Sequence, residues 1–197
     1  MKKNNKFTLT VVVPTYNRCN ELKKTLSILI KNKNPKICFL VLNNNSSDNS
    51  INIIKNFIKK DKRIFLKNHK KNIGAANNFR YGFKSSKTPY VCFVSDDDIL
   101  KGNYFDSCLE IFQNNKDVGL IHHEYGKKIS KFSKRYRIYK KGIESAKIAF
   151  NLSTIIAGLA VRKKLVNFIK YPVNKNFVYS YMSQILLITK KLRLAKI

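Results

Sequence analysis

The first half of the chain alternates short apolar runs with stretches in which apolar residues recur every three or four positions. Apolar runs of this kind are typical of strands buried on both faces of a parallel sheet, and the second pattern is typical of helices. The predicted strands are residues 9–13, ended by Pro14, then 37–42, 63–66 and 90–94. The predicted helices are residues 21–30, a segment with Ile51, Ile54 and Ile58 on one face that Ser47 and Asp48 are suited to cap, and residues 75–83. This alternation predicts an α/β fold with a mostly parallel sheet and helices on both faces.

The second half of the chain is less regular. It predicts strands at 118–121 and 155–161, a short basic helix at 162–170, and a final helix at 179–196 that is apolar in its middle and basic at its end. The chain has no internal repeat and no clear linker. Its 197 residues fit one domain. We therefore expect residues 1–115 and 116–197 to be two halves of the same domain.

Polar clusters follow three of the four predicted strands in the first half. Residues 14–18 follow the first strand, 43–48 follow the second, and 95–98 follow the fourth. Parallel sheets bind ligands at the carboxyl ends of their strands. The three clusters therefore predict one binding site along that edge.

The charge of the chain favours an anionic partner. Forty Lys and Arg residues against 11 Asp and Glu give a formal net charge of +29, which attracts phosphates, acidic lipids or nucleic acid. A coding sequence rich in A and T would also enrich Lys, Asn and Ile, so the charge alone does not select among these partners. A hydrophobic content of 44% excludes an intrinsically disordered chain.

The cysteines and the hydropathy indicate a compartment. The four cysteines show no CxxC or CxxH spacing, and Cys38 and Cys92 lie inside apolar runs, which favours a reducing environment without a disulfide framework or a cysteine metal site. The apolar run after the charged start is too short for a signal peptide. No run approaches the roughly 20 apolar residues of a membrane span. We expect a cytoplasmic protein.

Three adjacent carboxylates, Asp96, Asp97 and Asp98, follow the fourth predicted strand. They repel one another unless a cation compensates, and oxygen ligands favour Mg²⁺ or Mn²⁺ shared with substrate phosphates. The alternative is a solvated acidic turn that caps a helix starting near Lys101. The scarcity of acidic residues elsewhere in the chain favours the metal.

The cluster after the first strand offers groups suited to a nucleotide. Tyr16 has a ring that can stack on a base, Thr15 and Asn17 offer hydroxyl and amide groups for its edge, and Arg18 has a guanidinium for phosphate. Taken alone, the same residues fit an ordinary turn capped by Asn17 or Asn20.

Four segments in order resemble glycosyltransferase family 2 and cover roughly residues 9 to 100. Residues 14–18, with the leucines that follow, look like the family's opening, and 43–48 are similar to its Asp-Asn-x-Ser-x-Asp turn. Asn72 and Gly74, with Asn78 after them, resemble its Asn-x-Gly segment. Residues 90–100, which contain the three adjacent Asp, are similar to the family's DxD segment.

The resemblance implies a GT-A fold, which is Rossmann-like. It also implies a hexosyltransferase that transfers a sugar from a nucleoside diphosphate donor with inversion at the anomeric carbon. Residues 1–115 would be the donor-binding half and 116–197 a short acceptor-side half. The metal, Mn²⁺ or Mg²⁺, would be held by Asp97 with Asp98 beside it. The donor would be bound by Thr15, Tyr16, Asn17, Arg18, Asn43 at the base, Asn45, Asn72, Gly74, Asn78 and Asp96. The resemblance also implies a role in surface polysaccharide or lipid-linked glycan synthesis.

Two features depart from the family pattern. The family has Asp where this chain has Asn43, so a charge-assisted bond to a uracil would be lost. The family's general base lies in an acidic motif well after the DxD segment, whereas Glu124 and Glu144 are the last two acidic residues here. Glu124 is the candidate base, although Glu124 closing a strand and Glu144 starting a helix are also ordinary structural positions. His122 or His123 could serve instead. The chain is also short for the family, which fits either a compact variant or a truncated product that binds donor without transferring sugar.

Residues 131–141 interleave cations with aromatic side chains. This pattern fits nucleic acid, a lipid-diphosphate acceptor, an anionic membrane face or a solvated loop. Because no recognised nucleic-acid motif accompanies it, a glycan or lipid-linked acceptor, or peripheral contact with the inner face of the cell membrane, is favoured over nucleic acid, and a solvated loop is favoured over both.

Overall fold

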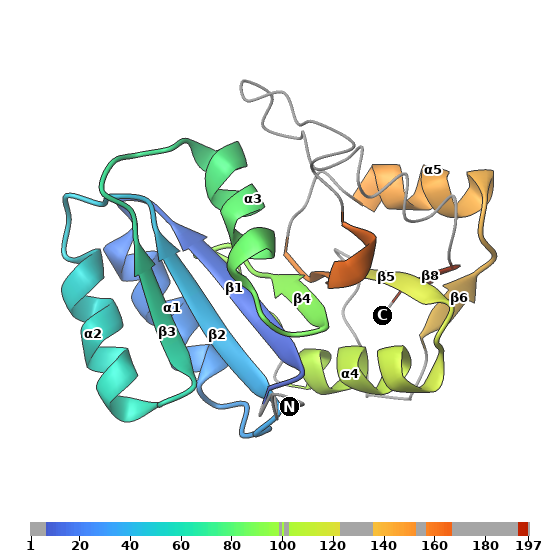
Figure 1. Ribbon diagram of the computed structural model, residues 1–197. Coiled ribbons are helices and arrows are strands. Elements are labelled where there is room, and N and C mark those ends of the chain that lie inside the picture. Colours follow the sequence, from blue (N-terminus) through green and yellow to red (C-terminus); the bar gives the residue numbers. More distant parts are fainter. Residues whose placement is uncertain are drawn as a thin grey trace, which may run out of the picture.

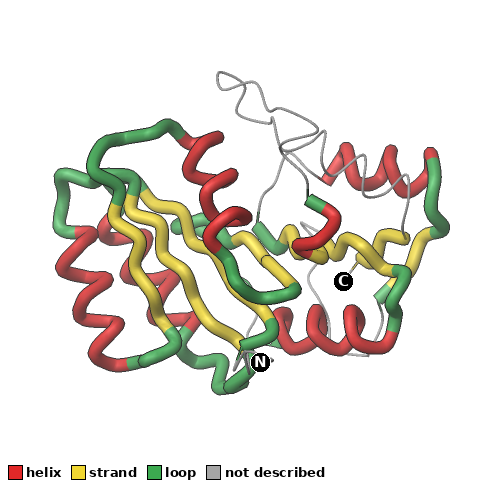
Figure 2. The backbone as a smooth tube through the Cα atoms, viewed as in Figure 1, coloured by secondary structure: helices red, strands yellow, loops and turns green. Residues whose placement is uncertain are grey.

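Four parallel strands form one half of a single sheet. The structure is a computed structural model that describes residues 7–98, 100, 103–122, 136–152, 157–166 and 193–196. The four strands are β1 (Leu9–Thr15), β2 (Ile37–Asn43), β3 (Ile64–Asn68) and β4 (Tyr90–Phe93), in the order β3-β2-β1-β4. Figure 2 shows them side by side in yellow. They match the four apolar runs of the sequence to within a few residues.

Helices cover both faces of this sheet, as the sequence predicts. They are α1 (Cys19–Leu29), α2 (Ser50–Lys60), α3 (Ala75–Ser85), α4 (Tyr104–Asn114) and α5 (Ile143–Leu152). The apolar stripes of α1, α2 and α4 pack on one face, against the side chains of Val11, Val13 and Phe39. Helix α3 packs on the opposite face through Phe79 and Phe83 (Figure 1).

The second half of the sheet mixes strand directions. Its strands are β5 (Val118–His122), β6 (Arg137–Tyr139), β7 (Leu159–Arg162) and β8 (Arg193–Lys196), and they continue the order as β7-β5-β8-β6. Strand β7 is antiparallel to both β4 and β5, β8 is parallel to β5, and β6 is antiparallel to β8. The eight-stranded sheet as a whole confirms the predicted α/β class.

Two predicted helices in the second half are wrong where the structure describes them. Residues 193–196, expected to end a helix, form β8 because Leu194 and Ala195 are fully buried between β5 and β6. The predicted helix at 162–170 is a single 3₁₀ turn, Lys163–Leu165, within the described part. In both places the pairing or packing outweighs the helical pattern.

Strand β1 continues through Pro14 to Thr15, whereas the sequence predicted that it ends at Pro14. The amide of Val94 donates to the carbonyl of Val12, so main-chain groups at every second residue from Val12 face β4. Pro14 faces the side on which the β4 ladder has already ended at Phe93, and a missing N–H is harmless there. The extension places Thr15 beside Asn43 at the edge of the sheet.

Helix α3 approaches the sheet closely at Gly82. A Cβ atom at this position would lie 2.7 Å from Cγ1 of Val12 and 3.0 Å from Cε1 of Phe93. The absence of a side chain therefore sets the distance between α3 and the central strands β1 and β4. None of the helices in the described residues, α3 included, is long and apolar enough to cross a membrane.

We expect Gly82→Ala to destabilise the protein by about 1–3 kcal/mol, the usual cost of overpacking. This cost outweighs the gain of about 1 kcal/mol that Ala brings to a helix interior. The urea midpoint of unfolding measures the change, and Lys84→Ala, at an exposed position of the same helix, is the matched control. A Gly82→Ala variant as stable as the wild type would contradict the close approach.

Candidate functional site

The carboxyl ends of β1 and β4 meet at a buried carboxyl group, that of Asp96. In the parallel register Val12 pairs with Phe93. Thr15 comes three residues after Val12, and Asp96 comes three residues after Phe93, so the two residues lie side by side. The hydroxyl of Thr15 donates to Oδ2 of Asp96 at 2.7 Å, and the hydroxyl of Thr25 donates to the Asp96 carbonyl at 2.8 Å. Neighbouring strands and α1 therefore fix this residue from two sides.

Arg18 joins Asp96 and Asp97. Its Nη1 contacts Oδ2 of Asp97 and lies 3.6 Å from Oδ1 of Asp96. The Asp96 side chain is 8% exposed, whereas those of Asp97 and Arg18 are 45% and 50% exposed. Burial raises the pKa of Asp96, and the Thr15 hydroxyl and the Arg18 charge partly oppose that rise. One inner and one outer carboxylate thus face the same cationic group.

These two carboxylates fit a divalent cation whose coordination shell is completed by a phosphate ligand. Among the residues that the structure describes, no three His, Cys, Asp or Glu side chains are grouped so that they could hold a metal ion. Mg²⁺ sites usually combine one or two carboxylates with waters and substrate phosphates, so a set of two is sufficient. Asp98 is half-buried, and its amide donates to the carbonyl of Ser95 in a turn.

The loop after β1 is bound to the loop after β2 through Asn17. The backbone amide of Asn17 donates to the hydroxyl of Ser46 at 3.0 Å. The side-chain Oδ1 of Asn17 accepts from the backbone amide of Ser47 at 2.8 Å. Asn17 and Asn45 both have left-handed backbones, with φ of 53° and 64°, a conformation that asparagine tolerates better than most residues. Tyr16, beside them, is 45% exposed, so its ring is accessible to a ligand.

Asp48 connects the first turns of two helices. Its Oδ2 accepts from the amide of Cys19 at 2.8 Å and its Oδ1 from the amide of Ser50 at 3.0 Å. Burial alone would raise the pKa of Asp48, but these hydrogen bonds lower it. The sequence predicted Asp48 as a helix cap. The structure shows that it contacts α1 as well as α2, and that Asn49 occupies the N-cap position without a side-chain cap bond.

Asn43 is fully buried and already hydrogen-bonded. Its Nδ2 donates to Oδ1 of Asn68 at 2.6 Å, and its Oδ1 accepts from the hydroxyl of Ser46 at 2.5 Å. A base at this position would have to replace one of these two bonds. The pattern of the sequence did not indicate Asn68 or Ser46 as partners, because both are ordinary polar residues at strand and loop ends.

The loop between β3 and α3 is held by asparagines. Asn44 donates to Oδ1 of Asn72 at 2.8 Å, and the same oxygen accepts from the amide of Gly74, whose φ is 78°. Asn78 is buried, where its Nδ2 donates to the carbonyl of Leu42 at 3.2 Å and its Oδ1 lies 3.0 Å from Nε2 of His69. Asn72, Gly74 and Asn78 therefore brace this loop against the end of β2.

The structure describes only some of the candidate general bases. Glu124 and His123 lie outside the described residues. His122 ends β5 and is 1% exposed, and Glu144 is exposed in the first turn of α5. The assignment of the general base therefore stays a prediction.

A mostly parallel α/β sheet of this order is the architecture of the GT-A fold. S. aureus TarS, residues 1–349, superposes with a TM-score of 0.77 at 15% identity, over 97% of this chain and 58% of that one. A mannosyltransferase from Pyrobaculum calidifontis, solved with GDP-Man and Mn²⁺, gives 0.66 at 13% identity, over 98% and 57%. These likenesses confirm the fold.

The model of Glycosyl transferase family 2 matches residues 10–168. The chain belongs to that family. An uncharacterized glycosyltransferase of Rickettsia bellii is 31% identical over 110 residues, which are 56% of this chain and 16% of that protein. Glycosyltransferase GlyG of Streptococcus pneumoniae is 28% identical over 113 residues, which are 57% of this chain and 37% of that protein. The chain thus spans well under half the length of these two relatives.

We expect Thr15→Val to destabilise the protein near pH 7 by about 1.5–3 kcal/mol, the range for hydrogen bonds to charged groups. The deficit should shrink toward about pH 4. Because the pKa of Asp96 is already raised in the folded state, ionising it costs stability as the pH rises through that pKa. Without the Thr15 hydroxyl, the pKa of Asp96 in the folded state rises further. The variant therefore loses more stability at a pH above this pKa than at a pH below it.

Urea unfolding at the two pH values measures this difference. Thr10→Val is the matched control, since Thr10 is buried in the same strand and its hydroxyl lies 2.7 Å from that of Thr88, an uncharged partner. Its deficit should not change with pH. Equal deficits for Thr15→Val at both pH values would show that the ionised carboxylate is not the acceptor.

Proposed function

We propose that this chain binds a nucleoside diphosphate sugar at the carboxyl ends of β1, β2 and β4 and transfers the sugar to an acceptor hydroxyl. The observation that carries the proposal is the pair of carboxylates, Asp96 and Asp97, facing one cationic group at the end of β4. Membership of the family supports it, as do the complexes of similar structures. TarS has been solved with UDP-GlcNAc and the mannosyltransferase with GDP-Man and Mn²⁺.

A divalent cation, Mn²⁺ or Mg²⁺, fits this carboxylate pair. Asp97 would hold it from the exposed side, with Asp98 next in the chain. Because Asp96 lies beside Asp97 and faces the same cationic group, we also assign Asp96 to the cation, in addition to the donor contact expected from the sequence. When bound, such an ion neutralises the negative charge that develops on a departing diphosphate. Thr15 keeps the inner carboxylate oriented toward that charge.

The loops at the edge of the sheet would form the rest of the donor site. Tyr16 would stack on the base, and the amides of Asn17 and Asn45 lie in the same pair of loops. Asn43 would contact the base edge only after exchanging its bond to Asn68 or Ser46. Asn72, Gly74 and Asn78 would act by holding the adjoining loop.

Transfer also needs a base that deprotonates the acceptor hydroxyl. Glu124 is our candidate, with Glu144, His122 and His123 as alternatives. We propose a glycan or lipid-linked acceptor in surface polysaccharide synthesis and a cytoplasmic location. The competing proposal is binding of the donor without transfer of the sugar. Donor binding is common to both proposals and is therefore tested first.

We expect UDP, GDP, CDP or dTDP to raise the melting temperature of the wild type in the presence of Mn²⁺ but not in its absence. Bound diphosphate without a cation would meet repulsion from the carboxylates. Asp97→Asn should weaken the metal-dependent binding by about tenfold or more, and Asp98→Asn should weaken it less. A thermal-shift titration measures both.

Glu110→Gln, at an exposed position of α4, is the control for the loss of a negative charge. Asp97→Asn and wild-type proteins that bind the same nucleoside diphosphate equally well with Mn²⁺ would refute the assignment of Asp97. A wild type that binds donor but transfers sugar to no lipid-linked glycan would favour binding without transfer.

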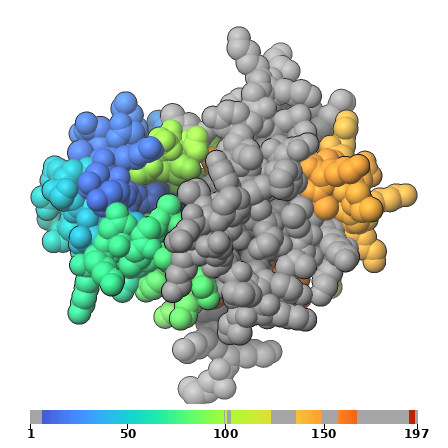
Figure 3. All heavy atoms as spheres, turned by 90° about the horizontal axis from the view of Figure 1, so that it is seen from above, coloured from blue at the N-terminus to red at the C-terminus, as the bar shows by residue number. Residues whose placement is uncertain are grey.

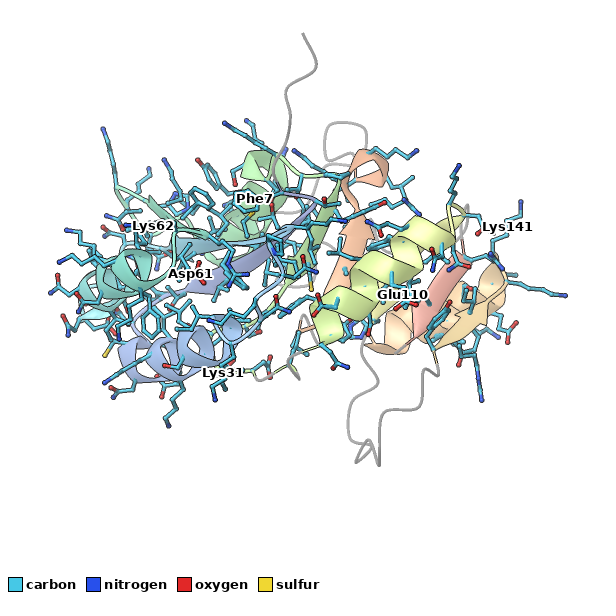
Figure 4. The ribbon with its side chains drawn as sticks, turned by 90° about the horizontal axis from the view of Figure 1, so that it is seen from below. Phe7, Lys31, Asp61, Lys62, Glu110 and Lys141 are labelled. Atoms are coloured by element: carbon cyan, nitrogen blue, oxygen red, sulfur yellow. The ribbon has the colours of Figure 1, made fainter. Side chains whose placement is uncertain are left out.

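We also propose peripheral contact with an anionic membrane, through the surface between β6 and α5. Ile143 is 76% exposed and Tyr136 is 37% exposed, and Lys140 and Lys141 are exposed between them. Exposed apolar side chains beside lysines suit the boundary between acidic headgroups and acyl chains. Lys141 and α5 lie at the end of the molecule opposite Lys62 and α2 (Figures 3 and 4).

We expect the protein to sediment with vesicles that contain phosphatidylglycerol and not with phosphatidylcholine alone. A lysine near an anionic surface contributes about 1 kcal/mol, so Lys140→Gln with Lys141→Gln should weaken binding by more than about tenfold. Ile143→Ser should also weaken it. Lys55→Gln with Lys59→Gln, on exposed positions of α2, removes the same charge elsewhere as a control. An equal loss in the control would indicate non-specific attraction.

A further inference from the structure

Arg18 occupies the position in which a cation would neutralise the carboxylate pair. Its guanidinium contacts Asp97 and lies 3.6 Å from Oδ1 of Asp96, so one side chain faces both acidic groups. From its position beside Tyr16, the sequence predicted that Arg18 binds the donor phosphate. In the structure, which contains no donor, Arg18 is paired with the carboxylates.

A guanidinium and a divalent cation cannot share this place. Both are positive and both need the outward oxygens of the same two carboxylates, so binding of one raises the cost of the other. Arg18 is half-exposed on the loop that leads into α1, which leaves its side chain room to move. Asp96, by contrast, is fixed by Thr15 and would stay in place when Arg18 leaves.

The loop that carries Arg18 also carries the accessible ring of Tyr16. A donor stacked on Tyr16 therefore brings its diphosphate close to the start of α1. A guanidinium released from the carboxylates can bind phosphate oxygens through two parallel hydrogen bonds. The same side chain would thus have one partner before the donor binds and a different partner afterwards.

We propose that Arg18 is a positioning residue that balances Asp96 and Asp97 in the ligand-free protein, is displaced by the divalent cation, and then binds the donor diphosphate. This proposal rests on the proposed function. It makes the metal and the donor bind cooperatively, because each favours the state in which Arg18 has left the carboxylates. Such coupling is reciprocal, so the donor raises the affinity for the metal by the factor by which the metal raises the affinity for the donor.

The test is a titration of the whole chain with Mn²⁺, in which the electron paramagnetic resonance signal reports free Mn²⁺. It is run without nucleotide and with saturating UDP or GDP, on the wild type, Arg18→Ala, Arg18→Lys and Lys24→Ala. Lys24 is exposed on α1 and provides the control for the loss of one positive charge. This readout follows metal binding directly and does not depend on turnover.

Without nucleotide, Arg18→Ala should bind Mn²⁺ about two- to fivefold more tightly than the wild type, as expected for loss of a half-exposed ion pair. Lys24→Ala should match the wild type, and Arg18→Lys should lie between. The increase in Mn²⁺ affinity on adding nucleotide should be smaller in Arg18→Ala than in the wild type.

An Arg18→Ala variant with wild-type Mn²⁺ affinity in the absence of nucleotide, but weaker nucleotide binding, would overturn the proposal and leave Arg18 as a simple phosphate ligand. Equal tightening in Lys24→Ala would also overturn it, because net charge would then explain the effect. A wild type that binds neither Mn²⁺ nor nucleotide would refute the proposed function itself, and this proposal with it.

Discussion

The hydrogen bond between Thr15 and Asp96 is the interaction on which the site depends. It joins the ends of two neighbouring parallel strands, and it requires β1 to run through Pro14 so that Thr15 reaches the edge of the sheet. A carboxyl group that is 8% exposed needs such a donor, because burial alone disfavours its charge. With the inner carboxylate fixed, the outer one at Asp97 can face solvent and ligands while remaining next to it.

Around this pair, the edge of the sheet is built mainly from neutral amides. Asn17, Asn43 and Asn44 connect the loops after β1, β2 and β3 by hydrogen bonds to Ser46, Asn68 and Asn72. Amides both donate and accept, so they can satisfy one another without a charged partner. Asp96, Asp97 and Arg18 form a charged group at this edge, whereas the carboxylate of Asp48 accepts from the backbone amides of Cys19 and Ser50.

Most of the first half could be predicted from the sequence, because its signals are local. Buried parallel strands appear as apolar runs, and the polar clusters after residues 13, 42 and 94 had to meet at one edge once the strands were parallel. The position of β7 beside β4 depends on a partner about seventy residues away, which no local pattern encodes. The hydrogen bonds of Asn43 to Asn68 and Ser46 could not be predicted either, because the sequence does not distinguish a buried amide from a ligand-binding amide.

The place of β8 has a consequence for the order of assembly. Strands β5 and β6 do not pair with each other, and each pairs instead with residues 193–196. During synthesis, β1 to β4 can associate as soon as residue 93 has emerged, whereas β8 at the far end of the sheet emerges about a hundred residues later. The edge of β4 is unpaired until β7 has emerged, and one edge of β5 is unpaired until residues 193–196 have emerged. Such edges are open to other chains and promote aggregation. A nascent chain of this protein is therefore expected to need protection by chaperones longest at its second half.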